Sequence, residues 1–244
     1  MIALLLDIQP GDEIIMPSFT FVSTANAFAS RGARIVFIDI SEDTLNLDVS
    51  KIESAISPKT RAIVAVHYAG IAADLKRLQI ICKNNNLVLI EDAACALGAR
   101  LENRPLGAWG DLSALSFHET KNVHCGVGGA LIINNPQYQE RSSKIWLKGT
   151  NRIEYMAGAV DKYTWVDLGG AFAPSELQAA LLWGQLEMLM KYKGKESKYG
   201  ILIRKASPLV KMQVCVEGRL YREKAFIMVT STISFFRAKN YEII

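Results

Sequence analysis

Leu87-Val88-Leu89-Ile90-Glu91-Asp92 is the stretch that decides the fold, because it predicts a buried strand that ends on two carboxylates. Its aliphatic residues continue without polar alternation, which is typical of a strand covered on both faces. The same pattern predicts further strands at Glu13–Met16, Arg34–Ile40, Ala62–His67, Leu112–Phe117 and Ala130–Ile133. Helix-like segments separate these runs. The sequence therefore predicts an α/β fold with a mainly parallel sheet sandwiched by helices.

Polar residues stand where several of these strands end. His67, Asp92 and Ser116 each lie at a strand's carboxyl end, which is the edge of a parallel sheet where ligands bind. Lys121 follows in a loop that closes with the glycine-rich turn Gly126–Gly129. A lysine after a strand is most often a solvated loop residue. With an acid at the end of a neighbouring strand, it is also placed to form a Schiff base with an aldehyde cofactor.

Helices are predicted between and after the strands. Asp74–Asn84 is amphipathic, and Asp48 is a plausible N-cap for a short helix through Ala55. Other helices are expected at Phe21–Ser30, Pro136–Lys148 and Ser175–Tyr192, with an irregular segment over 150–173. The last helix carries an apolar stripe that predicts packing in the core or between two subunits. Its members are Leu177, Ala180, Leu181, Gly184 and Met188.

The composition is that of a globular protein. The 244 residues are half hydrophobic, about a fifth are charged, and the net charge is +4. No lysine- and arginine-rich block is interleaved with aromatics, so nucleic-acid binding is not predicted. No apolar run reaches the roughly 20 residues that span a bilayer. The four cysteines, Cys82, Cys95, Cys125 and Cys215, show no metal-ligand spacing. We expect reduced thiols and a cytoplasmic protein without a metal.

Four motifs in order carry a family resemblance. The stretches Asp12–Asn26, His67–Gly70, Glu91–Ala94 and Ser116–Asn122 resemble the sugar aminotransferases of the DegT/DnrJ/StrS family. The resemblance covers about residues 1–190. Within the family, three more stretches are similar to members that aminate the 4-keto group of a dTDP-4-keto-6-deoxyhexose. These are Lys148–Arg152, Asp161–Trp165 and Leu177–Leu186.

The resemblance implies a fold-type I enzyme dependent on pyridoxal 5'-phosphate (PLP). Lys121 would be the Schiff-base lysine, Asp92 would pair with the pyridine nitrogen, Phe21 would stack on the ring and Ser116 would bind the phosphate. Cys95 occupies a position beside the ring hydroxyl where the family usually has Gln or His. Glutamate would be the amino donor, a nucleotide sugar the acceptor, and the active unit a homodimer.

The resemblance also implies a division of the chain. Residues 1–190 are expected to be the PLP-binding large domain without its N-terminal part, since relatives carry a phosphate-binding loop upstream of the segment that matches Met1. Residues 191–244 are expected to be a remnant of the small domain, because residues 214–244 no longer follow the family. A frameshift or a degraded reading frame would produce this pattern. The turn Gly126-Val127-Gly128-Gly129 also departs from the family's Gly-Glu-Gly-Gly.

Three functions remain open at this point. The first is a PLP-dependent nucleotide-sugar transaminase. The second is an inactive fragment of such an enzyme. The third is a non-catalytic α/β binding module that uses the same edge of the sheet. A dinucleotide-binding fold is disfavoured because no G-x-G-x-x-G motif follows an early strand.

Overall fold

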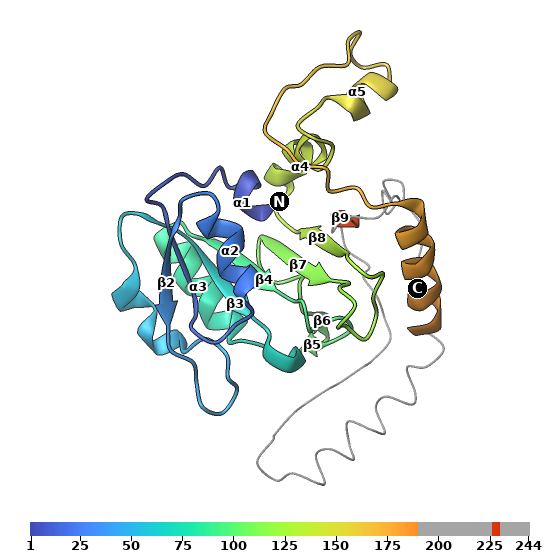
Figure 1. Cartoon of the computed structure of the whole chain (residues 1–244). Coiled ribbons are helices and arrows are strands. Elements are labelled where there is room, and N and C mark those ends of the chain that lie inside the picture. The colour runs from blue at the N-terminus through green and yellow to red at the C-terminus, as the bar shows by residue number, and fades with distance from the viewer. Residues whose placement is uncertain (190–225, 230–244) are drawn as a thin grey trace.

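The computed structural model describes residues 1–189 and 226–229. Its centre is a seven-stranded sheet in the order β2-β1-β3-β4-β7-β8-β9 (Figure 1). The first five of these strands run parallel, whereas β8 and β9 are antiparallel to their neighbours. The bounds are β1 Glu13–Pro17, β2 Arg34–Ile38, β3 Thr60–Val66, β4 Val88–Asp92, β7 Leu112–Ser116, β8 Gly129–Ile133 and β9 Phe226–Val229. The predicted mainly parallel α/β sheet is confirmed.

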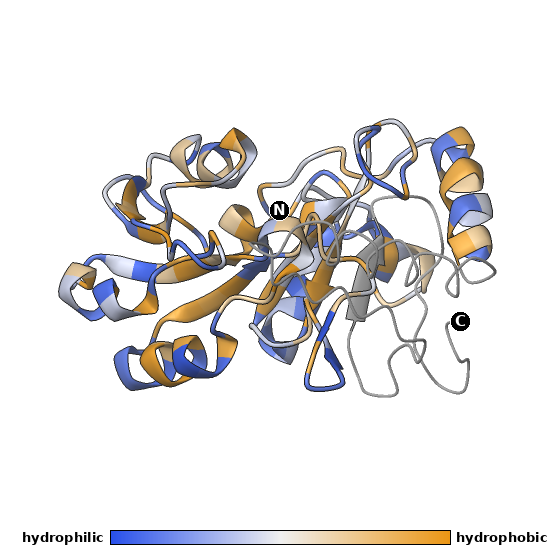
Figure 2. Ribbon diagram, turned by 90° about the horizontal axis from the view of Figure 1, so that it is seen from below, coloured by the Kyte–Doolittle hydropathy of each residue, from blue (hydrophilic) through white to orange (hydrophobic). Residues whose placement is uncertain are grey.

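The sheet is buried on both faces, as the continuous aliphatic runs predict. Along β3, Val64 belongs to one hydrophobic cluster and its neighbour Ile63 to the other, and both side chains are at most 1% exposed. Figure 2 shows the same arrangement, with apolar strands between helices that carry their polar residues outward. Successive side chains of a strand point to opposite faces. Helical cover on both faces therefore favours apolar residues at successive positions of a central strand.

Helices from different parts of the chain cover the two faces. On one face, α1 (Ile2–Leu5), α2 (Val22–Ala29) and α4 (Gln139–Trp146) contribute Leu5, Phe28 and Ile145 to the core. On the other face lies α3 (Leu75–Asn85), which buries Leu75, Leu78 and Ile81. The side chain of Asp74 caps α3 by accepting a hydrogen bond from the backbone N–H of Arg77.

Two predicted segments differ in detail. The helix expected at Asp48–Ala55 is a pair of 3₁₀ turns, η1 (Val49–Lys51) and η2 (Glu53–Ala55). Asp48 caps the first turn as predicted, but it also binds the hydroxyl of Ser50, and so short a segment does not propagate an α-helix. The segment 150–173, expected to be irregular, contains α5 (Arg152–Met156).

The remaining elements are short. They are η3 (Tyr68–Gly70), the two-stranded ribbon β5 (Arg100–Leu101) and β6 (Arg104–Pro105), and η4 (Pro136–Tyr138), which leads into α4. Except for β9, the expected small-domain remnant at 191–244 lies outside the described residues, as does the last part of the helix expected at Ser175–Tyr192. No helix in the described part of the chain is both long enough and apolar enough to cross a membrane.

The helix at residues 176–189 buries a different face from the one predicted. Ala179 and Leu182 are buried, and Leu182 packs with Phe117 and Ala130 near the ends of β7 and β8. All five members of the predicted stripe are exposed, and Leu177 has 84% of its surface in contact with solvent. The stripe therefore does not pack in the core of this chain, and the other expectation, packing between two subunits, stays a prediction. The helix has apolar residues on both sides, so periodicity alone could not select the buried one.

Leu182 and Leu181 provide a matched test of this orientation. Leu182→Ala should lower the free energy of unfolding by about 2–4 kcal/mol, because it leaves a cavity beside Phe117. Leu181→Ala removes the same atoms from a half-exposed position and should change the free energy by no more than about 0.5 kcal/mol. Urea unfolding of both variants measures the difference. Equal losses, or a larger loss for Leu181→Ala, would contradict the observed burial.

Candidate functional site

The predicted site residues leave the sheet from two adjacent strands. Strands β4 and β7 are parallel neighbours in which Asp92 pairs with Ala114, so Asp92 and Ser116 emerge at the same carboxyl edge. Lys121 lies in the loop that follows β7, where its backbone N–H donates to the carbonyl of His118. The segments that carry Asp92 and Lys121 are far apart in the sequence. The parallel pairing of β4 with β7 brings them together.

The loop that carries Lys121 is closed by backbone hydrogen bonds. Phe117 N–H donates to the carbonyl of Gly128, and Glu119 N–H donates to that of Gly126. Gly128 must lack a side chain, because a Cβ there would lie 2.3 Å from the sulfur of Cys125. The turn thus depends on its glycines. Val127, where the family has Glu, is 71% exposed and leaves this packing undisturbed.

The Lys121 side chain points toward the loop after β4. Its Nζ donates a hydrogen bond to the sulfur of Cys95 over 3.2 Å. Cys95 is exposed and Lys121 is half-buried. Because Cys95 lies just beyond Asp92 in the chain, this contact joins the lysine to the loop that holds the carboxylate.

Asp92 is held by hydrogen bonds to both of its carboxylate oxygens. Thr24 on α2 donates its hydroxyl to Oδ2 over 2.6 Å, and the N–H of Ala94 donates to Oδ1 over 3.1 Å. The hydroxyls of Thr20 and Thr24 are 2.9 Å apart. A carboxylate has about four acceptor positions, so this one retains capacity for another partner. Thr24 was missed from the sequence, because it lies far from Asp92 in the chain and meets it only after folding.

Phe21 and Ser116 lie at two other points of the chain at this edge, after β1 and at the end of β7. Phe21 is the N-cap residue of α2, and its side chain is 75% exposed. Its carbonyl accepts a hydrogen bond from the N–H of Thr24, which ties its position to the helix that supports Asp92. The hydroxyl oxygen of Ser116 accepts a hydrogen bond from the N–H of His118 over 3.3 Å. Its proton is still available to a further acceptor.

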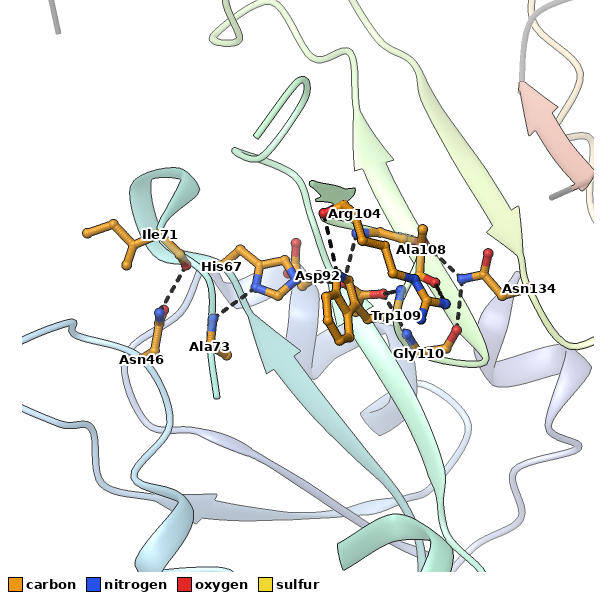
Figure 3. Close-up of polar contacts among 12 residues, drawn as sticks. Asn46, His67, Ile71, Ala73, Asp92, Arg104, Ala108, Trp109, Gly110 and Asn134 are labelled. Atoms are coloured by element: carbon orange, nitrogen blue, oxygen red, sulfur yellow. Dashed lines mark hydrogen bonds and ion pairs between the residues drawn. The ribbon is translucent and has the colours of Figure 1, made fainter. Parts of the chain in front are cut away.

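Beneath this edge lies a fully buried acid–base pair, His67 and Glu91. The Nε2 of His67 is 2.9 Å from Oε2 of Glu91, and neither side chain is exposed to solvent. The other ring nitrogen, Nδ1, accepts a hydrogen bond from the N–H of Ala73. That acceptor role places a proton on Nε2, which therefore donates to Glu91. Figure 3 shows His67 between Ala73 and the end of β4.

Glu91 also binds the turn that leads into β7. Its carboxylate accepts N–H groups from Gly107, Trp109 and Gly110 over 2.6–2.7 Å. Burial acts to raise the pKa of Glu91, but the hydrogen bond from His67 and the N–H groups of Gly110 and Gly107 outweigh it, so the pKa is lowered. The backbone N–H of His67 in turn donates to the backbone carbonyl of Asp92. The buried pair thus joins β3, β4 and the start of β7 directly under Asp92.

Two surface hollows lie elsewhere. One, of about 430 Å³, is lined by Leu89, Trp109 and Asp111 among others, and the second, of about 440 Å³, borders Asp48 and Asp74. None of the predicted site residues lines either of them. The described residues contain no group of three or more His, Cys, Asp or Glu side chains that could hold a metal ion. The chemistry therefore concentrates at the edge with Lys121 rather than in these hollows.

The side chains at this edge fit PLP in kind. They supply a primary amine, a carboxylate with acceptor capacity to spare, a hydroxyl and an exposed aromatic ring, which are the groups that an aldehyde, a pyridinium nitrogen, a phosphate and a ring face require. The mainly parallel sheet covered on both faces is the fold of the fold-type I PLP-dependent aminotransferases.

The comparison with protein families agrees with this class. Residues 1–236 match the DegT/DnrJ/EryC1/StrS aminotransferase family, and the chain belongs to it. The match extends beyond residue 190, where the recognised motifs end. Members of this family are PLP-dependent sugar aminotransferases.

Two relatives with assigned names are similar over three quarters of the chain. The dTDP-4-dehydro-2,3,6-trideoxy-D-glucose 4-aminotransferase of Saccharopolyspora spinosa is 33% identical over 192 residues, which are 77% of this chain and 50% of that protein. The spore coat polysaccharide biosynthesis protein SpsC of Bacillus subtilis is 37% identical over 185 residues, 75% of this chain and 48% of that protein. The chain thus spans about half the length of these relatives.

Solved structures show the same fold. The aminotransferase TlmJ from Streptoalloteichus hindustanus superimposes with a TM-score of 0.75 at 29% identity, covering 88% of this chain and 57% of that one. The sugar aminotransferase Spr1654 from Streptococcus pneumoniae, in its PLP form, gives a TM-score of 0.71 at 26% identity and covers 84% of this chain and 58% of its own. A structure of its PMP form is equally similar.

Replacing Glu91 tests the buried pair. Glu91→Gln keeps the shape but turns an acceptor oxygen into an amide that faces N–H donors, so the free energy of unfolding should fall by about 2–4 kcal/mol. The lowered pKa of Glu91 determines how its contribution to the free energy of unfolding depends on pH. The carboxylate's contribution is complete above the ordinary value of 4.5 and is lost as the pH falls through the lower folded-state pKa.

The difference between the parent chain and Glu91→Gln should therefore shrink in acid, as measured by urea unfolding across pH. Glu102→Gln is the matched control, since Glu102 is exposed and pairs with Lys76 at the surface; it should leave stability almost unchanged. A difference that stays constant or widens below pH 4.5 would refute the assigned ionisation of Glu91.

Proposed function

We propose that this chain belongs to a transaminase that moves an amino group from glutamate to the 4-keto group of a dTDP-4-keto-6-deoxyhexose. Residues 1–190 form its PLP-binding large domain, and residues 191–244 belong to its small domain. The enzyme works in the cytoplasm as a homodimer. Within the family, the motifs are similar to those of the transaminase that makes dTDP-4-amino-4,6-dideoxygalactose for enterobacterial common antigen.

The observation that carries the proposal is that Lys121 and Asp92 follow adjacent parallel strands at one edge of the sheet. Two parallel strands deliver an amine and a carboxylate there, and the Lys121–Cys95 contact joins their loops. PLP supplies an aldehyde that carries the amino group and a pyridine ring that withdraws electrons from the reacting carbon. Lys121 anchors the cofactor, and its amine then carries the proton between the cofactor carbon and the sugar carbon.

Asp92 keeps the pyridine nitrogen protonated in this proposal. That role requires the carboxylate to be fixed in direction, and the hydrogen bonds from Thr24 and Ala94 fix it. The bond from His67 N–H to the carbonyl of Asp92 fixes the backbone as well. Thr24 is thereby a positioning residue for Asp92, which the sequence motifs did not include.

Ser116 and Phe21 complete the cofactor contacts. The hydroxyl of Ser116 donates to the phosphate while its oxygen accepts from His118. The ring of Phe21 stacks on the pyridine face, and its exposure leaves that face of the edge uncovered for a planar ligand. Cys95 stands beside the ring hydroxyl, where its thiol is a weak hydrogen-bonding partner.

The sugar and the dimer rest on separate observations. The Saccharopolyspora spinosa relative is named as a 4-aminotransferase of a dTDP-4-dehydro sugar, which supports an acceptor of the same chemical class. The exposed apolar face of the helix at 176–189, with Leu177, Leu181 and Met188, supports contact with a second subunit, because large exposed patches commonly mark interfaces.

The decisive experiment is a spectroscopic titration with PLP. The purified chain should develop a visible absorption band from covalently attached PLP, and Lys121→Ala should lose it entirely, because Lys121 is the amine that the contact with Cys95 holds at this edge. Lys59→Ala is the control, since Lys59 is an exposed lysine next to the opposite, amino-terminal end of β3, and it should keep the band.

Adding glutamate then separates the remaining functions. Conversion of the band to that of the aminated cofactor, followed by recovery with a dTDP-4-keto-6-deoxyhexose, supports transamination. A band that glutamate leaves unchanged indicates an inactive cofactor-binding fragment. A chain that never shows a Lys121-dependent band would exclude PLP chemistry and favour a non-catalytic binding module.

Thr24 provides a second, independent test. Thr24→Val removes the hydroxyl that donates to Asp92 but keeps the shape, so PLP should bind about tenfold more weakly, as expected for losing a hydrogen bond to a charged group. Thr24→Ser keeps the hydroxyl and should bind PLP like the parent chain. The dissociation constants come from the same titration. If the two variants bind PLP equally well, Thr24 does not position Asp92.

A further inference from the structure

The contact between Lys121 and Cys95 brings two nucleophiles together from different loops. The lysine nitrogen and the thiol sulfur are 3.2 Å apart, which is a hydrogen-bonding distance. Cys95 is exposed to solvent. Cofactor attachment needs the lysine, but it does not need a thiol in contact with the lysine nitrogen. If the Cys95 sulfur were oxidised, it would already be in contact with an amine that can react with it.

The other described cysteines lack this combination. Burial raises the pKa of Cys82 to about 12, with a smaller contribution from the nearby Asp111, and burial also raises the pKa of Cys125. Thiolates rather than thiols react with oxidants, so these two buried sulfurs are protected. Cys95 is the exposed cysteine of the described part of the chain.

We propose that Cys95 is an oxidation site and that Lys121 captures the oxidised sulfur in a reversible S–N bond. Hydrogen peroxide first oxidises the Cys95 thiol to a sulfenic acid. An S–O bond forms, the O–O bond of the peroxide breaks, and one water is released. The deprotonated lysine nitrogen then attacks the sulfur. An N–S bond forms, the S–O bond breaks, and the departing hydroxide takes a proton from nitrogen to leave as a second water.

A thiol reductant reverses the bond in two steps. Its sulfur attacks the Cys95 sulfur, which returns the electron pair and a proton to the Lys121 nitrogen and leaves a mixed disulfide. A second thiol then frees Cys95 and carries away the disulfide. Each cycle consumes one peroxide and two thiols. The nearby amine favours capture over further oxidation, because an intramolecular partner already in contact reacts far faster than one in solution.

The consequence for activity rests on the proposed function. While the S–N bond exists, the Lys121 nitrogen cannot attach PLP, so the oxidised chain is locked in a form without covalently bound cofactor. Conversely, attached PLP occupies the same nitrogen, so the Lys121 amine can no longer react with an oxidised Cys95. Peroxide and PLP therefore compete for one atom, and the site is a redox switch on cofactor loading.

Mass spectrometry of the full chain tests the cross-link without relying on activity. After peroxide treatment of the PLP-free protein, the intact mass should fall by two hydrogens. Peptide mapping should then join the Cys95 and Lys121 peptides, and dithiothreitol should restore both. Lys121→Arg, whose side chain does not condense in this way, should lose the cross-link and accumulate a Cys95 sulfenic acid that dimedone traps.

Further variants exclude other products. Cys95→Ser should abolish the mass change, whereas Cys215→Ser should retain it, which rules out a disulfide between these two cysteines. Prior loading with PLP should suppress the cross-link. Peroxide treatment that yields only sulfinic acid at Cys95, equally in the parent chain and in Lys121→Arg, would overturn the proposal.

The outcomes distinguish this inference from the proposed function. A cross-link in a chain that never shows a PLP band would leave the redox chemistry standing and remove the proposed function. A PLP band in a chain that forms no cross-link would do the opposite. If both hold, the cross-linked chain should show no PLP band until dithiothreitol is added.

Discussion

The buried pair of His67 and Glu91 is the interaction on which the rest of the site depends. Two ionisable side chains without solvent contact are tolerable only if every polar atom is satisfied, because an unpaired buried charge costs several kcal/mol. Here Glu91 meets that condition with three backbone N–H groups and the imidazole, and His67 with the N–H of Ala73. These partners come from three segments. The ends of β3 and β4 and the start of β7 can therefore take one relative position only, and that position presents Asp92 and Lys121 at the same edge.

Much of the fold could be predicted from the sequence, because a strand buried on both faces has a continuous run of aliphatic residues. The runs at Ala62–His67 and Leu87–Asp92 contain no alternation, and both are central strands of the sheet. The helix at 176–189 shows where that reasoning stops. Apolar residues lie on both of its sides, and the buried side is chosen by contact with Phe117 and Ala130, which are distant in sequence. Hydrophobic periodicity depends only on the residues of the helix itself, so it could not distinguish the buried side from the exposed stripe.

The candidate site was predictable to a different degree. Lys121, Asp92 and Ser116 were recognised by their places after strands, and they remain predictions for the cofactor contacts that only binding experiments will test. Thr24 and Glu91 were missed because their roles exist only after folding. Glu91 looks like one more strand-end acid in the sequence, yet it points inward among backbone N–H groups, whereas its neighbour Asp92 points toward α2. Alternation along β4 puts two adjacent carboxylates on opposite faces, and this gives them separate tasks.

The outer strand of the sheet has a consequence for biosynthesis. Strand β9, at Phe226–Val229, pairs with β8, at Gly129–Ile133, although most of the chain's second half lies between them. Until the ribosome has released residue 229, β8 has no partner on that side, and its unpaired backbone groups form an open edge able to recruit strands from other chains. Contacts of such long sequence separation also form slowly. The nascent chain thus passes through a stage in which most of its core is present and its sheet is unfinished, so chaperone demand and aggregation should depend on how promptly the C-terminal segment arrives.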